Sequence, residues 1–515
     1  MTVGLPLRPA LGVVALAITT LACGPAARAQ EAAQQGEGGR AWRFTPSLSV
    51  QQTFTDNYRI QPDRESDAVT QATVGMRLVG AGTRLRGDLD LSLTGLAYAR
   101  HSEENNIQRY LRGNGSVELL EDRAFVEVNG SVTQQQISAF GPATDNAALA
   151  NDNRTQVTNL TISPFIRGPL GGSVQYEARY TYGLTRSSQF GAADSSTSGL
   201  LLSLQGGDRQ RTLSWSVAAN SQVSDFSEGE ESESDSLRGT LSYPVLPSVV
   251  LTGIGGVERS DLQSATKERH SISGLQLEWV PSERTNLSAR FERRYFGDSH
   301  AVNFSFRTPR TVWTFSDTRD INLLGGGTGN TGLGSVYDVL FLQFASVEPD
   351  LQRRDLLVRS LITQLNLNPN ATVIPGFLSA SPTLQRRQSL SLALVGKRSN
   401  LLLQASQSNT QRVNNVASGI SDDLSRADNV RQRGFDVTFS HKLTPIASVS
   451  TSVSWQRSRG DTNAQSSALK TVSTGYNTQI GYRTSLNVGA RYTQSTGSVQ
   501  PYTERAVYGS VGFSF

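Results

Sequence analysis

Apolar and polar residues alternate with a period of two along most of the chain after Trp42. The clearest run places Val174, Tyr176, Ala178, Tyr180, Tyr182 and Leu184 between Gln175, Glu177, Arg179, Thr181, Gly183 and Thr185. Successive side chains of a β-strand point to opposite faces, so each segment is predicted to be a strand with one apolar and one polar face. The segments have roughly 9–13 residues, and a tilted strand of about 10 residues crosses a bilayer.

Short turns and longer polar loops alternate between these segments. Gly, Pro, Asn and Asp supply the turn geometries. Short turns are expected at residues 80–82, 121–123, 168–172, 206–210, 244–247, 281–285, 308–310, 397–400 and 443–445. Longer loops are expected at residues 56–67, 138–154, 187–195, 227–236, 260–269, 414–431 and 460–467. This alternation predicts an all-β fold, an antiparallel transmembrane β-barrel of about 22 strands, whose even strand number would place both termini in the periplasm.

The last segment of the chain has an aromatic residue at its end. One strand face would carry Val507, Gly509, Val511, Phe513 and Phe515. This arrangement resembles the terminal signal that the barrel-insertion machinery reads in outer-membrane proteins, although Gly509 stands where a larger apolar residue is usual. We therefore expect the barrel-insertion machinery to be a partner of the chain.

The first residues of the chain have the features of an export signal. Residues 11–22 are apolar and follow Arg8, and a small-residue cleavage site ends at Ala29. We therefore predict a signal peptide at residues 1–29, a flexible periplasmic leader at 30–41 and the barrel at 42–515. Lipidation of Cys23 is the alternative, but Thr20 occupies the position where a lipobox has leucine.

Composition narrows the class of protein. Hydrophobic residues make up 37% of the chain and the mean hydropathy is -0.32, and no later stretch approaches 18 apolar residues, which excludes a helical membrane protein. Barrel strands are only half apolar, so a barrel fits these values. A sandwich or propeller with so many polar faces would lack a core, and a β-helix needs a short repeat that the sequence does not contain. A net charge of +4 without basic runs gives no indication of nucleic-acid binding.

Residues 321–386 interrupt the strand pattern. Leu351, Val358, Leu361, Ile362 and Leu365 share one face of a predicted helix. This segment is therefore predicted to be a helix-containing loop insertion that follows strand 15 and lies outside the cell. It could fold into the lumen as a constriction or plug, or cap the surface loops, and the sequence favours neither.

Charged residues on polar strand faces must point to a wet lumen, because hydrocarbon does not accommodate them cheaply. The candidate lumen-facing residues are Arg84, Arg86, Asp88, Asp90, Glu177, Arg179, Arg290, Glu292 and Arg294. Their mixed sign predicts pairing across the lumen rather than a channel selective for anions. The tryptophans Trp42, Trp215, Trp279, Trp313 and Trp455 fall on apolar faces, which is typical of interfacial girdles.

Motifs for catalysis or cofactor binding are missing from the sequence. It has no nucleophile elbow, phosphate-binding loop or zinc-type motif, and its four histidines, His101, His270, His300 and His441, are scattered. Asp56, Asn57, Asp63 and Asp67 could hold calcium, but turn capping explains them more simply. The acidic run at residues 228–235 is interpreted as a solvated loop. We therefore predict no enzyme, no cofactor and no metal site.

Several stretches resemble the outer-membrane proteins encoded near PEP-CTERM/exosortase exopolysaccharide loci. They are residues 44–57 (FTPSLSVQQTFTDN), residues 302–313 (VNFSFRTPRTVW), the helical insertion and residues 396–401 (GKRSNL). The resemblance spans nearly the whole mature chain and implies an outer-membrane barrel associated with exopolysaccharide export or display. Its other partners would be outer-membrane lipid, lipopolysaccharide and export proteins. A general diffusion porin or nutrient channel is the first alternative, and a barrel that only presents surface loops is the second.

Overall fold

The computed structural model describes residues 42–189, 194–207, 213–227, 231–262, 266–323, 335–365, 367, 369, 376–413, 422–462, 465–497 and 500–515. The predicted signal peptide, leader and Cys23 lie outside the described residues. Residues 228–230 of the acidic loop and residues 324–334 of the insertion also lie outside them. None of the described helices is long and apolar enough to cross a membrane.

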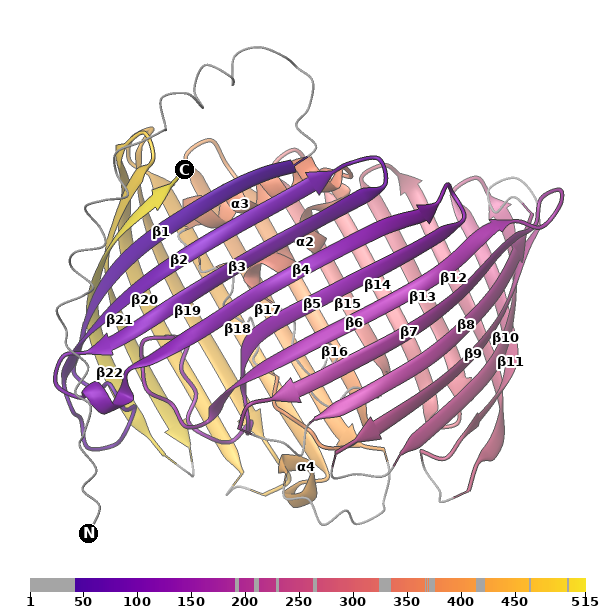
Figure 1. Ribbon diagram of the computed structural model, residues 1–515, viewed down its shortest axis with the longest axis horizontal. Helices are drawn as coiled ribbons and strands as arrows, with labels where there is room; N and C mark the ends of the chain where they lie inside the picture. The colour runs from indigo at the N-terminus through magenta and orange to yellow at the C-terminus, as the bar shows by residue number, and fades with distance from the viewer. Residues whose placement is uncertain are drawn as a thin grey trace, which may run out of the picture.

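A single antiparallel sheet of 22 strands closes on itself to form a barrel (Figure 1). Each strand pairs with its neighbours in chain order, and β1 pairs with β22. The strands are β1 (Trp42–Thr55), β2 (Asp67–Ala81), β3 (Leu85–Tyr98), β4 (Asn106–Leu120), β5 (Ala124–Gln136), β6 (Arg154–Pro169), β7 (Gln175–Ser187), β8 (Ser195–Gly206), β9 (Ser214–Phe226), β10 (Ser232–Leu246), β11 (Val249–Ser260), β12 (Glu268–Ser282), β13 (Thr285–Arg294), β14 (Gly297–Arg307), β15 (Thr311–Asn322), β16 (Thr383–Val395), β17 (Ser399–Arg412), β18 (Asn429–Lys442), β19 (Ala447–Arg459), β20 (Ser466–Gly481), β21 (Thr484–Gly497) and β22 (Tyr502–Ser514). The predicted fold class is confirmed.

Within the described residues the helices are few and lie in the connections. They are η1 (Ser102–Glu104), α2 (Val336–Gln343), η3 (Phe344–Ser346), α3 (Leu351–Leu365) and α4 (Asp423–Arg426). Helix α3 lies at the residues whose apolar side chains recur with helical spacing.

The two ends of the barrel differ in the length of their connections. At the turn end, uppermost in Figure 1, strands join through short turns such as residues 121–123 and 308–310. At the loop end they join through longer segments, including residues 56–66 and 137–153. One connection at the loop end is tight: Tyr295 and Phe296 join β13 to β14, and Gly297 follows with a φ of +96° that favours glycine. The first described strand begins at the turn end and the last strand ends there.

The outward face of the barrel carries its large apolar side chains. Phe44, Phe54, Val74, Leu275 and Phe291 are among those that are more than half exposed. Cross-strand partners such as Leu48 and Val74 keep these side chains on one face from strand to strand. The result is a continuous apolar exterior around a polar interior, as lipid requires.

The terminal strand belongs to this exterior. Its residues Val507, Val511 and Phe513 lie opposite Phe54, Val50 and Leu48 of β1. The amide of Phe515 donates to the carbonyl of Pro46 at 3.1 Å. The residues of the proposed insertion signal therefore close the barrel against its first strand.

Candidate functional site

The lumen contains part of the chain itself. Strand β15 ends at the loop end at Asn322 and β16 begins there at Thr383, and residues 335–365 of the intervening chain lie inside the barrel. We call the described residues 335–365 the lumen insertion. Its helices α2 and α3 lie between the wall formed by β2–β4 and the wall formed by β14–β18, near the turn end (Figure 1). Of the two arrangements that the sequence left open, folding into the lumen is the one observed.

A capping box starts the first helix of the lumen insertion. The Asp338 amide donates to the Ser335 hydroxyl at 3.2 Å, and the Asp338 carboxylate accepts from the Ser335 amide at 3.1 Å. This reciprocal pair satisfies backbone donors that would otherwise lack partners at the helix start. The other Asp338 oxygen lies 2.5 Å from the Arg112 guanidinium of β4. The start of α2 is thus attached to the barrel wall.

One face of the lumen insertion is apolar and packs on the barrel wall. Val358, Leu361, Ile362 and Leu365 of α3 join Leu340 and Phe344 in a buried cluster. The wall contributes Val312 of β15, Ala393 of β16 and Leu402 of β17 to the same cluster. Fully burying a large aliphatic side chain contributes about 1.5–3 kcal/mol, so this cluster is the main source of docking free energy.

The opposite face of α3 is charged and faces β2 and β3. Asp355 lies 2.5 Å from Arg77 of β2 and 2.9 Å from Arg359 of its own helix. Arg359 in turn lies 3.0 Å from Asp90 of β3. The Asp355 side chain is only 13% exposed, so solvent screens this network less than it would a surface pair. We call Arg77, Asp90, Asp355 and Arg359 the docking network.

Tyr337 of α2 completes the charged face. Its hydroxyl donates to Asp355 at 2.6 Å. The guanidinium groups of Arg112 and Arg359 each lie 4.9 Å from the centre of its ring. Cations near an aromatic face are attracted by its quadrupole, so Tyr337 links both helices to the wall.

Two glutamines attach the lumen insertion to the β15–β18 wall. Gln343 donates to the Val312 carbonyl at 3.2 Å and accepts from the Ser391 hydroxyl at 3.0 Å. Gln364 accepts from Asn400 at 3.0 Å through its side chain and from Ser440 at 2.6 Å through its carbonyl. The lumen insertion is therefore held by two walls of the barrel at once.

Acid is expected to loosen this attachment. Burial alone would raise the pKa of Asp355, but the Tyr337 hydroxyl and the cations Arg77 and Arg359 lower it below its ordinary value of 3.8. The docking free energy that ionised Asp355 contributes is therefore fully present above about pH 4. It is lost as the pH falls through the lowered pKa of Asp355. Channel openings in planar bilayers should be unchanged between pH 7 and 5 and become frequent below pH 4. An Asp355→Asn variant should lack this transition, and an identical acid response in both would contradict the assignment.

A second segment folds inward at the loop end. Residues 137–153, which we call the folded loop, pack Ala148 against Tyr58 of the β1–β2 connection and Leu149 against Tyr502 of β22. The Tyr98 hydroxyl donates to the Ala148 carbonyl at 2.9 Å. Asp145 accepts from the Ser454 hydroxyl of β19 at 3.4 Å. The folded loop therefore crosses from β5 and β6 to the opposite side of the lumen mouth.

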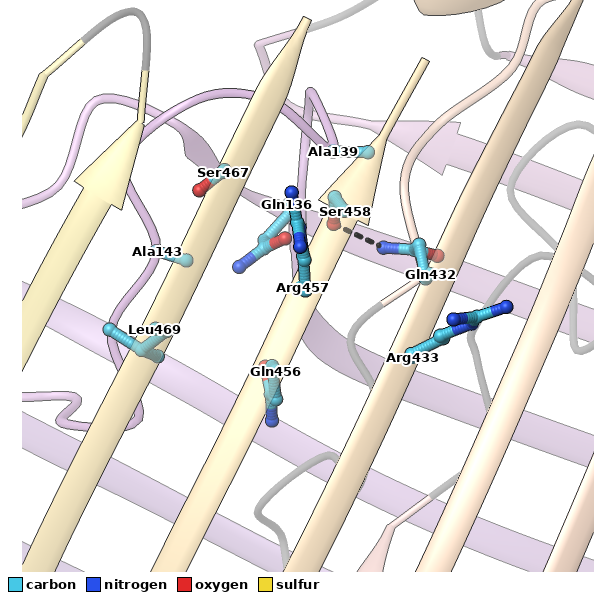
Figure 2. Close-up of a pocket in the computed structure, with 10 residues that line it drawn as sticks. All are labelled: Gln136, Ala139, Ala143, Gln432, Arg433, Gln456, Arg457, Ser458, Ser467 and Leu469. Carbon is cyan, nitrogen blue, oxygen red and sulfur yellow. Dashed lines mark hydrogen bonds between the residues drawn. The ribbon is translucent and has the colours of Figure 1, made fainter. Parts of the chain in front are cut away.

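The folded loop leaves a small cavity against the wall (Figure 2). Its inward-facing wall residues include Gln432, Ser458 and Leu469, and Ala139 and Ala143 come from the folded loop. Gln432 donates to Ser458 at 3.3 Å, along the dashed line in Figure 2. The cavity is an internal gap beside the folded loop and contains no constellation of reactive groups.

The predicted lumen residues of β7 and β13 lie on the inward face, where they pair along the wall. Arg179 lies 2.6 Å from Glu127 of β5 and 2.9 Å from Glu177. In the second group, Glu292 lies 2.7 Å from Arg238 of β10 and 3.5 Å from Arg290, and Arg294 lies 2.8 Å from Glu258 of β11. The predicted pairing across the lumen is therefore wrong for these residues, because acids on nearby strands are within reach.

The predicted lumen residues near β3 are divided between two environments. Asp90 joins the docking network, and Asp88 lies 3.3 Å from Arg77. By its register, Arg86 lies on the same inward face of β3, and Arg84 lies in the adjoining turn. Both side chains are exposed. The sequence thus identifies the acids of this site but not their cationic partners.

The histidines and the acidic residues considered for calcium have structural contacts. Asp67 accepts from the amides of Ala68 and Arg100 and lies 2.9 Å from the His101 ring nitrogen. His300 lies 3.0 Å from Asp317. Within the described residues there is no group of three or more histidines, cysteines or acids that could hold a metal ion. Turn and strand-end capping accounts for Asp67, as the simpler interpretation predicted.

Several residues of the site were not predicted. Arg77 and Arg112 occupy polar positions in strands β2 and β4, and nothing in a period-two pattern separates them from other inward-facing arginines. The folded loop was predicted only as a polar loop. Its run Ala147-Ala148-Leu149-Ala150 was the available signal, since apolar residues in a long loop require a covering surface.

The fold and the site together define a class of protein. A closed antiparallel barrel with an apolar exterior and a charged, hydrogen-bonded interior has the architecture of an outer-membrane β-barrel. In this barrel two segments of the same chain occupy the lumen.

The comparisons with known proteins bear only on this architecture. No protein-family model matches the chain, and no curated protein matches its sequence. Among solved structures, the chain is similar to the FrpB iron transporter from Neisseria meningitidis, with 10% identity, 95% of this chain and 83% of the other covered, and a TM-score of 0.48. It is also similar to the siderophore receptor PirA from Pseudomonas aeruginosa, with 11% identity and a TM-score of 0.41, and to PirA from Acinetobacter baumannii, with 10% identity and a TM-score of 0.46. Each of these two matches covers 92% of this chain and 80% of the other. With TM-scores below 0.5, these likenesses carry no functional conclusion.

Proposed function

We propose that the protein is an outer-membrane channel for hydrophilic solutes and that its lumen insertion is the gate. The attachment of this insertion to two walls by side chains supports the proposal. A passive filler needs only apolar packing, whereas the docking network adds charged contacts that can be broken without unfolding the barrel. Displacement of residues 335–365 would widen the lumen near the turn end.

We also propose that the turn end faces the periplasm. The first and last strands both have their free ends at the turn end, which fits a chain exported with its termini inside. An epitope inserted at residues 463–464 should then be detected on intact cells, and one in the turn at residues 121–123 should not. Surface detection of the second epitope alone would reverse the assignment.

The composition of one wall supports a neutral, hydrogen-bonding cargo. The inward positions of β17–β21 carry mostly hydroxyl and amide side chains: Gln404, Ser406, Ser408, Thr410, Thr438, Ser440, Ser450, Ser452, Ser454, Thr471, Ser473, Thr493 and Ser495. Most of these side chains are buried in this structure, so they become able to exchange hydrogen bonds with sugar hydroxyls only when the covering segments move aside. They would then impose no charge preference. A carbohydrate is therefore the proposed cargo. Association with exopolysaccharide export follows from the family resemblance, and uptake of small sugars is the alternative.

Solute flux tests the nature of the cargo. Liposomes that contain a variant lacking residues 335–365 should swell in neutral trisaccharides at least about as fast as in sugar acids of equal size. The deletion leaves charges of both signs facing the lumen, Arg77 and Arg112 beside Asp88 and Asp90, so no single sign dominates. Several-fold faster entry of the sugar acids would contradict a neutral cargo. Cells without the protein should release less exopolysaccharide. Unchanged release together with slower growth on oligosaccharides would instead favour uptake.

A further inference from the structure

A group of cations lies on the outside of the barrel near the loop end. Arg431 and Arg433 of β18, Arg457 and Arg459 of β19 and Lys470 of β20 are all exposed. They occupy alternate positions with Phe435 and Trp455, on the face opposite the inward Gln432 and Ser458. Figure 2 shows Arg433 and Arg457 on these neighbouring strands. We call these five residues the outer basic patch.

The strand register places like charges directly opposite each other. Arg431 is the cross-strand partner of Arg459, and Arg433 is the partner of Arg457. Like charges in directly opposed positions destabilise a sheet. In the described part of the structure no carboxylate pairs with Arg431, Arg433, Arg457 or Lys470, and Arg433 donates only to the Gln407 side chain at 2.8 Å. An external anion would remove this repulsion.

Some other outward cations near the loop end have acidic partners. Arg386 of β16 lies 2.7 Å from Asp317, Lys267 lies 2.5 Å from Glu233, and Arg186 lies 3.4 Å from Asp194. The exterior thus neutralises some of its cations in pairs, whereas Arg259 of β11 and Arg269 of β12 form another opposed and exposed pair. Within the described residues, Arg431, Arg433, Arg457 and Lys470 extend over three adjacent strands without such an acidic partner.

The height of the patch relative to the apolar exterior indicates the kind of anion. Arg433 and Arg457 lie one outward position beyond Phe435 and Trp455, toward the loop end. Aromatic side chains mark the boundary between hydrocarbon and headgroups. The cations therefore lie at headgroup height, with an apolar surface directly beneath them for acyl chains.

We propose that the outer basic patch binds the phosphates of a phosphorylated glycolipid in the surrounding leaflet. Guanidinium groups bind phosphate through paired hydrogen bonds, and four arginines in two opposed pairs suit a headgroup with two phosphates. The acyl chains lie along Phe435 and Trp455. This binding is separate from the channel, because the patch and the lumen lie on opposite faces of the wall.

Lipid binding by the purified full-length barrel tests the proposal. The probes are bisphosphorylated lipid A, its dephosphorylated form and inorganic phosphate, and native mass spectrometry in detergent counts the bound lipid. The wild-type protein should retain one bisphosphorylated lipid. The variant R431Q/R433Q/R457Q/R459Q should bind it at least about tenfold more weakly. Equal binding by both proteins, or inorganic phosphate held as tightly as the lipid, would overturn the proposal.

A matched control and a second measurement separate binding from folding. The variant R109Q/R186Q/R259Q/R293Q removes four exposed outward arginines from four other strands and should bind the lipid within about twofold of wild type. Without lipid, the patch variant should melt no lower than wild type, because its like-charge pairs are gone. Lipid should raise the melting temperature of the wild-type protein and of the control variant, but not that of the patch variant. Equal loss of binding in the control variant would refute a specific site. If the fourfold variant does not fold, R431Q/R459Q and R433Q/R457Q test each opposed pair.

Discussion

Replacing residues 335–365 with a short glycine-serine linker is expected to turn a quiet barrel into a large pore. The barrel has 22 strands, and barrels of this size have a lumen wide enough to need a plug. Single-channel conductance in planar bilayers should rise by about an order of magnitude over the intact protein. Heat-modifiable migration on a denaturing gel should be retained, because the strands pair without the insertion.

The folded loop provides the control for this prediction. Shortening residues 142–150 at the loop end should change conductance less than removal of the lumen insertion, because helices fill more of the lumen than one loop. If both deletions fold and neither conducts, the barrel acts as an anchor for its loops and the channel proposal fails.

Asp355→Ala is the point substitution with the largest expected effect on the gate. It removes the acid shared by Arg77 and Arg359, whose side chains are 20% and 28% exposed. Removing one partner of a fully buried pair costs about 3–5 kcal/mol, so about 2 kcal/mol is expected for this partly exposed network. Docking of the lumen insertion should weaken about 30-fold. Two measurements report this weaker docking: channel openings in planar bilayers should become more frequent, and trypsin should cleave faster within residues 353–359.

Asp320→Ala is the matched control for this substitution. Asp320 is also a lumen acid, and it lies 3.4 Å from Arg294, away from the lumen insertion. Its removal should leave the opening frequency within about twofold of wild type. Equal effects of the two substitutions would show that lumen charge in general, rather than the docking network, controls opening.

The barrel was predictable because its pattern is local. Alternation in segments such as residues 174–185 sets one face of each strand, and the turn residues set where the strand ends. The number of strands follows from counting these segments, and the structure has the predicted number. The tight Tyr295–Phe296 connection shows that the alternation of short and long connections holds only as a trend.

The site was less predictable because it depends on contacts between distant parts of the chain. The apolar face of α3 was visible in the sequence, but its docking surface is formed by Val312, Ala393 and Leu402 on three different strands. These residues occupy inward positions where a barrel normally has polar side chains. Similarly, Asp90 was identified as a lumen acid, whereas its partner Arg359 comes from 269 residues further along the chain. The strand register and the alternation of inward and outward positions do not by themselves determine such pairings.

The attachment of the lumen insertion to two walls has a mechanical consequence for the barrel. The seam where β1 meets β22 is the place at which an unfinished barrel is still open. The lumen insertion joins β2–β4 on one side of that seam to β14–β18 on the other, so it acts as an internal strut across the closure. It can reach both walls only after the strands have come together. Docking therefore marks the end of assembly, and a barrel whose strut has been released should separate first at its seam.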